Sequence, residues 1–397
     1  MKTILILNPY ISTLGGGEKH MGYLCQFFEQ YFDYDVKIEI LVFEYETNVD
    51  ATGSPITTVD AINKTFGLNL QKTYIRKLRL ERENTRWLRL KNKRLVESIS
   101  KEYDIFVNFM FLSKHVGKAK KNVYEVMFPA RKTQRANPLK HLIWRCMDKR
   151  FLNSYDAFIS NSQFTNDWLK KYWGTRLNAN VVYPPVFTEK DNLTDRYVEK
   201  MKENIIISVG RFFVAGHNKK QLEMVKFFVE NQDKLGGLQY HLVGQCSERK
   251  EDIDYLNQIK EVASKVKNVF IHTNSPYSDL IELYKKAKIF WHGTGYGVDE
   301  NLNPEQMEHF GITTVEAMSF GAVPIVINKG GQKETVENGV NGFRWDTEAE
   351  CVDFTAKLLG DDSLRIKMAE ESTKRAKNYS VDEFYRQNRK VMDELKI

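Results

Sequence analysis

An arginine and two lysines in the second half of the sequence are well suited to holding an anion. Arg211 directly follows the apolar run 203–210, and Lys219 and Lys220 come within the next ten residues. A guanidinium fork and a lysine ammonium match phosphate oxygens, and a helix start offers free N–H groups to the same anion. Three cations near a helix start are also ordinary solvated charges, which oppose the helix dipole. The segment 210–221 therefore predicts either a phosphate site or a solvated helix end.

Two glutamates lie eight positions apart in EHFGITTVEAMSFGAVPIV (308–326). Gly311 lets a ligand approach the backbone, and the amides of Ile312 and Thr313, in the first helical turn, are donors for a diphosphate. Glu316 lies further inside this helix. The spacing from Thr313 to Glu316 also fits a capping box, in which the glutamate accepts from a backbone N–H. A ligand-contacting role and a capping role for Glu316 are both open.

A glycine pair, Gly330-Gly331, forms a third motif with Glu334 just beyond it. It follows the apolar run 322–327 and fits a tight turn. Like the other two segments, it comes after a predicted strand. Ligands of parallel α/β sheets bind at the carboxyl ends of strands, so three such motifs predict a binding cleft.

The elements that position these motifs follow from the apolar pattern. Short apolar runs alternate with longer helical segments, which indicates parallel sheets with crossover helices. Two prolines in Tyr183-Pro184-Pro185-Val186 remove two N–H donors and interrupt the pattern, which then restarts. We therefore expect an α/β protein of two Rossmann-like, doubly wound domains, 1–186 and 187–379, facing each other across a cleft. The expected strands are 2–7, 37–43, 104–111, 123–128, 154–160, 203–210, 238–244, 268–272, 288–293 and 322–327, and the expected helices include 18–32, 219–233, 252–266, 278–286 and 311–319.

Composition excludes several classes of protein. The chain has 397 residues, of which 42% are apolar and 28% charged, unlike a disordered or fibrous protein. The longest apolar stretch, 105–112, is far shorter than the roughly 20 residues of a membrane-spanning helix. The apolar start MKTILIL ends at Asn8 and Pro9, too soon for a signal peptide. We expect a cytoplasmic protein whose four separated cysteines are free thiols.

The positive charge is concentrated in the first half of the chain. Residues 1–190 carry a net charge of +11 and residues 191–397 one of −4. Segment 71–95 has ten basic and two acidic residues, and segment 131–150 has seven and one. Such segments suit a membrane interface, or else their apolar side chains face the core while the charges are solvated. The interleaved apolar residues are Leu78, Leu80, Trp87, Leu88, Leu90, Leu139, Leu142, Ile143 and Trp144.

Taken together, the motifs resemble glycosyltransferase family 4, retaining GT-B enzymes that use nucleotide-activated sugars. Glu308 and Glu316 match the family's E-x7-E motif, and the Gly330-Gly331 motif matches its GG-x-x-E. The family's phosphate clamp matches 210–219, its N-terminal glycine loop matches GGGEK (15–19), and its first-domain exit matches SNSQFT (160–165) and VVYPPV (181–186). The wording EHFG is similar to lipid-linked oligosaccharide mannosyltransferases and to bacterial surface-polysaccharide enzymes.

The resemblance implies a role for each matching residue. Arg211 and Lys219 would hold the leaving diphosphate, Glu308 would orient the donor sugar, and these three would be the catalytic residues. Lys220 is the alternative phosphate contact, although helix phase favours Lys219. A C-terminal helix at about 380–397 is expected to pack back on the first domain. The implied donor-binding residues are Gly16, Gly17, Gly210, Lys220, His272, Asn274, Phe310, Gly311, Ile312, Thr313 and Glu316.

Two features concern the catalytic histidine and the metal. The family often has a histidine after the strand 123–128, where this chain has Met127 and Phe128, and the nearby His115 and His141 are expected to be structural. The D-x-D strings 33–35 and 252–254 precede a strand and open a helix, so we expect solvated acids there. Neither a metal nor another cofactor is expected.

The resemblance implies hexosyl transfer, with retained configuration, from a nucleoside diphosphate sugar to a glycan or lipid-linked glycan in surface polysaccharide or glycolipid biosynthesis. We expect the enzyme in the cytoplasm, either free or attached peripherally to the inner face of an anionic membrane. The alternative is a non-catalytic nucleotide-sugar-binding scaffold. A dehydrogenase is excluded because no G-x-G-x-x-G follows the first strand, and no segment resembles a nucleic-acid recognition motif.

Overall fold

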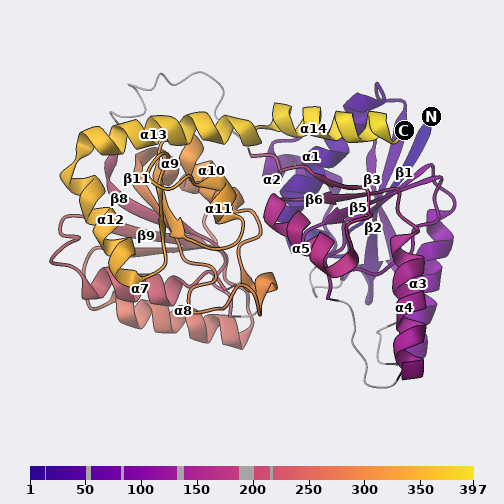
Figure 1. The fold of residues 1–397 in the computed structure, drawn as a ribbon, viewed down its shortest axis with the longest axis horizontal. Helices are drawn as coiled ribbons and strands as arrows, with labels where there is room; N and C mark the ends of the chain where they lie inside the picture. The colour runs from indigo at the N-terminus through magenta and orange to yellow at the C-terminus, as the bar shows by residue number, and fades with distance from the viewer. Residues whose placement is uncertain (14, 51–54, 82–84, 132–137, 187–200, 215–217) are drawn as a thin grey trace. The chain divides into compact units, whose positions relative to one another are not determined.

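A computed structural model describes the chain except for residues 14, 51–54, 82–84, 132–137, 187–200 and 215–217, and except for the side chains of residues 13, 138–142 and 144. The chain forms two compact units (Figure 1). The first unit comprises Met1–Pro185 and Phe384–Ile397, and the second comprises Val186–Glu383. Each unit is an α/β sheet of parallel strands covered by helices, in agreement with the predicted fold class.

The first unit is built on a seven-stranded sheet in the order β3-β2-β1-β4-β5-β6-β7. Its central strand pairs with both neighbours in parallel, through Ile4 with Ile38 on one side and Ile4 with Ile105 on the other. Residues 4–7 of the central strand are apolar and fully buried, because helices cover both faces of the sheet there. The strands are β1 (Lys2–Leu7), β2 (Val36–Glu44), β3 (Thr73–Arg79), β4 (Ile105–Asn108), β5 (Lys121–Val126), β6 (Ala157–Ser160) and β7 (Ala179–Val181). The helices are η1 (Ile11–Thr13), α1 (Gly16–Tyr31), α2 (Val59–Phe66), α3 (Arg86–Ser100), α4 (Pro138–Leu152) and α5 (Gln163–Trp173).

The second unit repeats this plan with a six-stranded sheet in the order β10-β9-β8-β11-β12-β13. Alternate residues of its central strand enter two apolar clusters, with Ile206 on one face and Ile205 and Ile207 on the other. The strands are β8 (Glu203–Val209), β9 (Gln239–Gly244), β10 (Val269–Thr273), β11 (Ala287–His292), β12 (Val323–Ile327) and β13 (Phe343–Trp345). The helices are α7 (Gln221–Glu230), α8 (Lys250–Ala263), α9 (Tyr277–Lys286), η2 (Pro304–Gln306), α10 (Ile312–Ser319), α11 (Gln332–Thr335), α12 (Glu348–Gly360), α13 (Asp362–Ala376) and η3 (Lys377–Tyr379).

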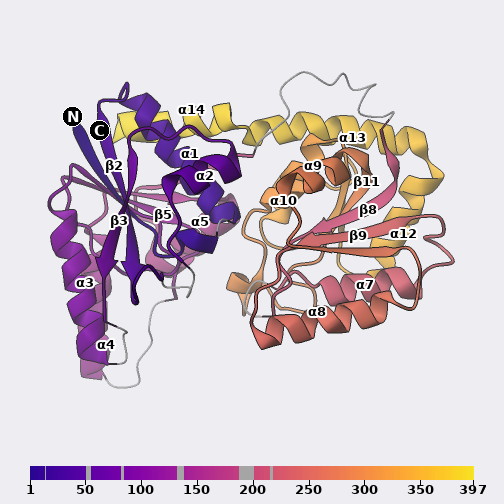
Figure 2. The ribbon, with the colours of Figure 1, turned by 180° about the vertical axis from the view of Figure 1, so that it is seen from behind.

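The strand order reverses beside the central strand of each sheet. In the second unit β8 lies between β9 and β11, and in the first unit β1 lies between β2 and β4. Figure 2 shows the second sheet with its helices on both faces. The crevice at the carboxyl ends of strands that flank such a reversal is the usual ligand site of doubly wound sheets.

The helix α14 (Val381–Glu394) belongs to the first unit although it follows the second unit in sequence. It lies beside α1 in both views (Figures 1 and 2). Phe384 packs edge-on against His20 with ring centroids 5.2 Å apart, and the Tyr31 hydroxyl donates to Asp393 at 2.7 Å. Upstream, Val186 pairs with Ser380, so the two points where the chain passes between units are neighbours.

One expectation about the acidic strings is wrong. Asp252 is not solvated but only 1% exposed. Its carboxylate accepts hydrogen bonds from the Ser247 hydroxyl at 2.6 Å and from the Val214 amide at 3.2 Å, and it pairs with Arg249. Asp252 thus anchors the segment that follows β8. In the other string, Asp33 and Asp35 are exposed.

Candidate functional site

Two glycines make close contacts at the carboxyl end of β8. A Cβ on Gly244 would lie 2.0 Å from the Gly210 carbonyl oxygen, and a Cβ on Gly210 would lie 2.6 Å from Cγ of Lys219. The Gln221 side-chain amide donates to the carbonyls of Gly210 and Arg211, both at 3.0 Å. Glycine at position 210 thus lets the stem of Lys219 lie against the strand end.

Lys219 and Glu308 form an ion pair at this strand end. The ammonium of Lys219 lies 2.5 Å from Oε2 of Glu308, and both side chains are largely buried. The sequence predicts a helix that begins at Lys219, but in the structure Lys220 is the N-cap residue and α7 begins at Gln221. Lys219 therefore precedes the helix. The structure therefore brings together two of the three predicted catalytic residues.

The imidazole of His292 completes this cluster. His292 is the last residue of β11, and its Nε2 lies 3.1 Å from the same Glu308 oxygen and 3.2 Å from the Thr294 hydroxyl. Burial lowers the pKa of His292, with a smaller opposing effect of Glu308, so the neutral ring donates its Nε2–H. Its Nδ1 is buried and has no hydrogen-bond partner within the described part of the chain. His292 is not among the site residues predicted from the sequence, although a histidine that ends a buried strand, β11, between β8 and β12 was a usable signal.

The glycine pair holds the loop that carries Glu308. The Gly331 amide donates to the Glu308 carbonyl at 2.7 Å, and a Cβ on Gly331 would lie 2.1 Å from the His309 carbonyl oxygen. Gly330 has a φ of +60°, and a Cβ there would lie 2.3 Å from the Glu308 carbonyl oxygen. The motif that reads as a tight turn is thus also a backbone support for Glu308.

The segment before Glu308 is fastened to the same turn. The ammonium of Lys329 donates to the carbonyls of Gly295 and Val298, at 3.2 and 2.6 Å. Glu300 accepts from the Gly330 amide at 3.0 Å and pairs with Lys333 at 2.9 Å. The long connection between β11 and α10 is thereby held at several points.

Phe310 and Gly311 lead into α10. Phe310 is 2% exposed and packs against Tyr379. Gly311 is the N-cap residue, with a φ of +98° that disfavours any side chain. Ile312 and Thr313 form the first turn, where helix N–H groups lack intrahelical acceptors. The start of α10 can therefore offer backbone donors to an anion.

Glu316 does not complete a capping box. Thr313 lies inside the helix rather than at its cap, so the box predicted as an alternative is absent from α10. Instead, the Glu316 carboxylate accepts from the hydroxyls of Tyr277 at 3.4 Å and Tyr284 at 3.3 Å. These contacts fix it against α9, and Glu316 itself is only 5% exposed.

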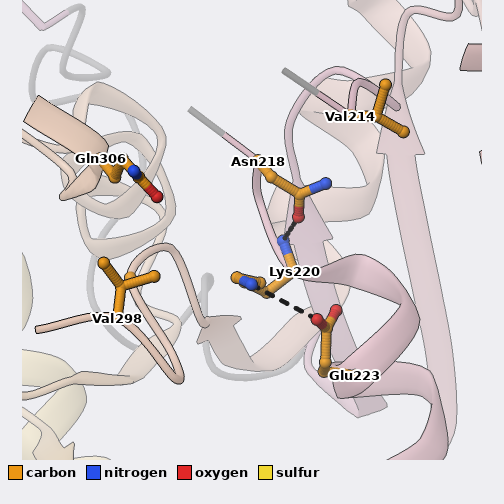
Figure 3. A pocket seen from close by; sticks show the side chains of 7 residues that line it. Val214, Asn218, Lys220, Glu223, Val298 and Gln306 are labelled. Atoms are coloured by element: carbon orange, nitrogen blue, oxygen red, sulfur yellow. Dashed lines mark hydrogen bonds and ion pairs between the residues drawn. The ribbon is translucent and has the colours of Figure 1, made fainter. Parts of the chain in front are cut away.

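A cavity of about 260 Å³ lies between the start of α7 and the connection that follows β11 (Figure 3). Lys220, in the left-handed region with a φ of +58°, lines it together with Glu223, and their side chains lie 3.4 Å apart. The side chain of Asn218 accepts from the Lys220 amide at 2.7 Å and so fixes this turn. The lining residues are Val214, Asn218, Lys220, Glu223, Gly295, Val298 and Gln306.

Three predicted site residues, Arg211, His272 and Asn274, make contacts with residues other than Lys219 and Glu308. Arg211 is exposed, and its guanidinium lies 5.4 Å from the ring of Phe213. His272 is directed to β9, where its Nε2 lies 3.0 Å from Nδ1 of His241, and Asn274 accepts from the Cys246 amide at 3.1 Å. The structure does not bring the His272 ring to the Lys219–Glu308 pair.

Gly16 and Gly17 open α1 of the first unit. The Glu18 carboxylate accepts from the Gly15 amide at 2.9 Å and so caps the helix start. A Cβ on Gly17 would meet nothing within 4 Å. Crowding within the unit therefore does not require glycine at position 17.

Met127 and Phe128, which stand where the family often has a first-domain histidine, make contacts within the first unit. Phe128 is 1% exposed, and the Met127 carbonyl accepts from the Asn161 side-chain amide at 3.2 Å. His115 is buried, 2.9 Å from the Ser113 hydroxyl, and burial lowers its pKa to about 3. The side chain of His141 lies outside the described residues.

The described residues contain neither a metal-binding cluster nor a membrane-spanning helix. No three His, Cys, Asp or Glu side chains of these residues gather as a cation site would require. No described helix has both the length and the apolar character to cross a bilayer. The four cysteines are free thiols.

Curated proteins similar to this chain include mannosyltransferases. A GDP-Man:Man(3)GlcNAc(2)-PP-Dol alpha-1,2-mannosyltransferase from Caenorhabditis elegans is 25% identical over 211 residues, which cover 50% of this chain and 42% of that protein. An alpha-1,3/1,6-mannosyltransferase ALG2 from Yarrowia lipolytica is 27% identical over 222 residues, covering 50% and 47%. The chain spans about half the length of the curated relatives it matches.

Solved structures match over the whole chain. A glycosyltransferase from Rickettsia africae superposes with a TM-score of 0.70 at 18% identity, covering 99% of this chain and 98% of the other. Anabaena Alr3699/HepE, in complex with UDP and glucose, gives a TM-score of 0.66 at 15% identity, covering 99% and 100%. At this identity the likeness concerns the fold.

The family comparison concerns the unit that carries the Lys219–Glu308 pair. Residues 189–375 match the family described as "Glycosyl transferases group 1", and this range is nearly the whole of the second unit. With two parallel α/β sheets and full-length structural neighbours, the fold is GT-B. Residues 189–375, somewhat less than half of the chain, are therefore similar to the group 1 glycosyl transferases, and the two-sheet fold is that of the solved glycosyltransferase structures.

Proposed function

We propose that this protein is a retaining hexosyltransferase, which moves a hexosyl group from a nucleoside diphosphate sugar to a hydroxyl of a glycan acceptor. The observation that carries the proposal is the ion pair of Lys219 and Glu308 at the carboxyl end of β8, next to the first turn of α10. A cation, a carboxylate and helix amides lie where doubly wound sheets bind nucleotides. The retaining outcome rests on the resemblance to glycosyltransferase family 4.

In the proposed reaction, the bond from the anomeric carbon to the diphosphate oxygen breaks, and the diphosphate keeps the electron pair. The acceptor oxygen forms the new bond to the anomeric carbon, and its proton passes to the leaving diphosphate. Charge develops on the leaving diphosphate, so fixed donors aimed at it give the main rate acceleration. Lys219, Arg211 and the amides of Ile312 and Thr313 are these donors, and Glu308 orients the hydroxyls of the sugar.

The proposed acceptor is a lipid-linked glycan in surface-polysaccharide or glycolipid biosynthesis. The printed names of the C. elegans and Y. lipolytica relatives describe mannosyltransferases, one of them acting on a PP-Dol-linked substrate. We place the proposed reaction at the cytoplasmic face of a membrane. A non-catalytic nucleotide-sugar-binding scaffold is the competing reading, and it would bind the donor without any turnover.

Alanine at Lys219 or at Arg211 tests the proposal. Each substitution should lower kcat/KM by about 10²-fold or more, because each removes a charge that stabilises the leaving diphosphate. The measurement is release of nucleoside diphosphate from a panel of nucleotide sugars, with Lys226→Ala, exposed on the neighbouring helix α7, as a control. Near-native turnover of both variants would exclude the assigned site, and donor binding with no turnover by the wild type would favour the scaffold.

Metal independence is part of the proposal. Because Lys219, Arg211 and the start of α10 supply positive potential where a metal would act, transfer should survive excess EDTA. Rates are compared with and without the chelator, then with added magnesium. Complete inhibition that magnesium reverses would contradict this part and leave the transfer reaction intact.

A further inference from the structure

Two neighbouring helices of the first unit expose large apolar side chains among basic ones. On α3, Trp87 is 66% exposed and Leu90 is 46% exposed. On α4, Ile143 is 52% exposed and Met147 is 40% exposed. Side chains three or four positions apart share a helix face, so each pair forms part of an apolar stripe. We call the exposed side of α3 and α4 the α3–α4 surface.

The two helices lie side by side, as Figures 1 and 2 both show. An ion pair at 2.7 Å joins Arg150 of α4 to Glu97 of α3. Val96 and Ile99 of α3 and Phe151 of α4 enter the core of the unit. The buried side of each helix is thereby fixed, and so is the side that faces out.

The charge of the α3–α4 surface is strongly positive. Segment 86–100 contains five basic residues and one acid, and segment 138–152 contains four and one. Both acids are already paired: Glu97 is 7% exposed and contacts Arg150 and Lys118, and Asp148 lies 2.8 Å from Lys114. The exposed basic residues of the two helices are Arg86, Arg89, Lys91, Arg94, Arg145, Lys149 and Arg150.

This arrangement differs from the interface expected over the whole of segment 71–95. Residues Thr73–Arg79 form β3, which is hydrogen-bonded to β2 at the sheet edge, and Leu80 is 5% exposed in the core. The side chains of Leu139, Leu142 and Trp144 lie outside the described residues. The surface therefore rests on Trp87, Leu90, Ile143, Met147 and the cations around them.

We propose that the α3–α4 surface docks on an anionic lipid bilayer, with its apolar side chains entering the headgroup layer and its cations meeting lipid phosphates. Apolar insertion combined with charge attraction characterises interfacial helices. A nucleic acid or soluble polyanion would satisfy the cations but would leave Leu90, Ile143 and Met147 in water. The inference extends the proposed function by naming the phase in which a lipid-linked acceptor would be met.

Vesicle cosedimentation of the full chain tests the docking. The protein should sediment with vesicles containing phosphatidylglycerol and not with pure phosphatidylcholine, and the bound fraction should fall steeply as salt rises from about 0.05 to 0.5 M, where the screening length shortens from above 10 Å to a few ångströms. Each removed cation should weaken the partition coefficient about fivefold. Neither donor nor acceptor is present, so failure here would leave the transfer reaction untouched.

Two variants separate charge from insertion. Arg89→Glu with Arg94→Glu should abolish binding at moderate salt, whereas Lys250→Glu with Lys260→Glu, exposed on α8 of the second unit, is the matched charge control and should bind like the wild type. Trp87→Ser with Leu90→Ser keeps every charge and should still lose about tenfold or more in partitioning, since apolar burial contributes roughly 0.8 kcal/mol per CH₂. Circular dichroism checks that α3 is retained in each variant.

A fluorescent label at Cys146 reports insertion directly. Cys146 is exposed on α4, one position before Met147, and Cys25 and Cys351 are buried, so a Cys246→Ser background leaves one reactive thiol. A polarity-sensitive label should shift to the blue on anionic vesicles only. The proposal would be overturned if the protein did not bind anionic vesicles at low salt, or if the two charge variants bound equally. It would also be overturned if the protein bound heparin or RNA with no spectral shift on vesicles, or if it formed a stable dimer that buries the label.

Discussion

One carboxylate oxygen of Glu308 receives both the ammonium of Lys219 and the imidazole of His292. Lys219 would be drawn to a bound diphosphate, but His292 is buried at the end of β11 and is fixed there. The imidazole therefore sets the direction of the carboxylate whether or not a donor is present. We regard His292 as a positioning residue, which acts through Glu308.

Substitution of His292 should impair turnover more than donor binding. In His292→Phe the ring volume is kept but the donor N–H to Glu308 is lost, so kcat should fall about tenfold or more with a small change in KM. His292→Gln can still donate to the carboxylate and should recover part of the rate. Steady-state kinetics with a nucleotide sugar, together with Tm values, would check this. Equal rates for the two variants would show that the hydrogen bond has no role in catalysis.

Among the elements, the Gly330-Gly331 turn links two motifs that are separate in sequence. A Cβ on Gly331 would lie 2.1 Å from the His309 carbonyl oxygen, which is backbone and has little freedom to move. Gly331→Ala should therefore displace the Glu308 loop and lower kcat/KM at least tenfold, with about 1–3 kcal/mol lost in stability.

Gly360→Ala is the matched control for this prediction, since a Cβ there meets nothing within 4 Å. Activity assays and chemical denaturation of the two variants give the comparison. If Gly331→Ala kept full activity at a lowered stability, the turn would be a packing contact without influence on Glu308.

Most of the strands that the sequence predicts are largely buried, and β10, with no buried residue in Val269–Thr273, is an exception. Short apolar runs such as 2–7 and 203–210 indicate a strand, because a short segment is apolar along most of its length only when helices cover both faces of the sheet. The strand β3 escaped prediction because six of its seven residues, TYIRKLR, are exposed or half-exposed at a sheet edge. The three-residue strands β7 and β13 are too short to show a period.

The candidate site was predictable where a motif has its own local geometry. Gly210, Gly311 and Gly331 occupy positions that tolerate no side chain; Gly311 and Gly331 stand out in their own motifs, and Gly210 through the resemblance to the family. The burial of Asp252 and the contact of His292 with Glu308 depend on loops that no periodic pattern describes. These contacts arise only when strands distant in sequence come together.

For the whole molecule, the docking of α14 on the first unit depends on a buried histidine. His20 packs between the rings of Phe109 and Phe384, and its Nε2 has no hydrogen-bond partner among the described residues. Burial lowers its pKa from 6.5 to about 3. Between these values the unfolded imidazole is protonated and the folded one is not. The stability due to the neutral ring is therefore complete above pH 6.5 and is lost as the pH falls towards 3.

His20→Phe should remove this acid sensitivity. The wild type should lose about 2 kcal/mol more than the variant between pH 7 and pH 5, because one pKa unit corresponds to about 1.36 kcal/mol. Denaturant unfolding of the first unit at both pH values would measure the difference. Parallel losses in the two proteins would show that His20 titrates normally and is not sealed by Phe384.

The return of α14 also sets an order of assembly during translation. Residues Met1–Pro185 leave the ribosome first, but Phe384 and Tyr385, which pack on His20 and Phe27 of α1, follow only after the whole of Val186–Glu383. Domains usually fold in order of synthesis, yet here the earlier unit waits for the later one with an apolar helix face uncovered. A ribosome that stalls within the second unit thus releases a chain whose amino-terminal unit is incomplete. The first unit is therefore completed only after Val186–Glu383 has been synthesised.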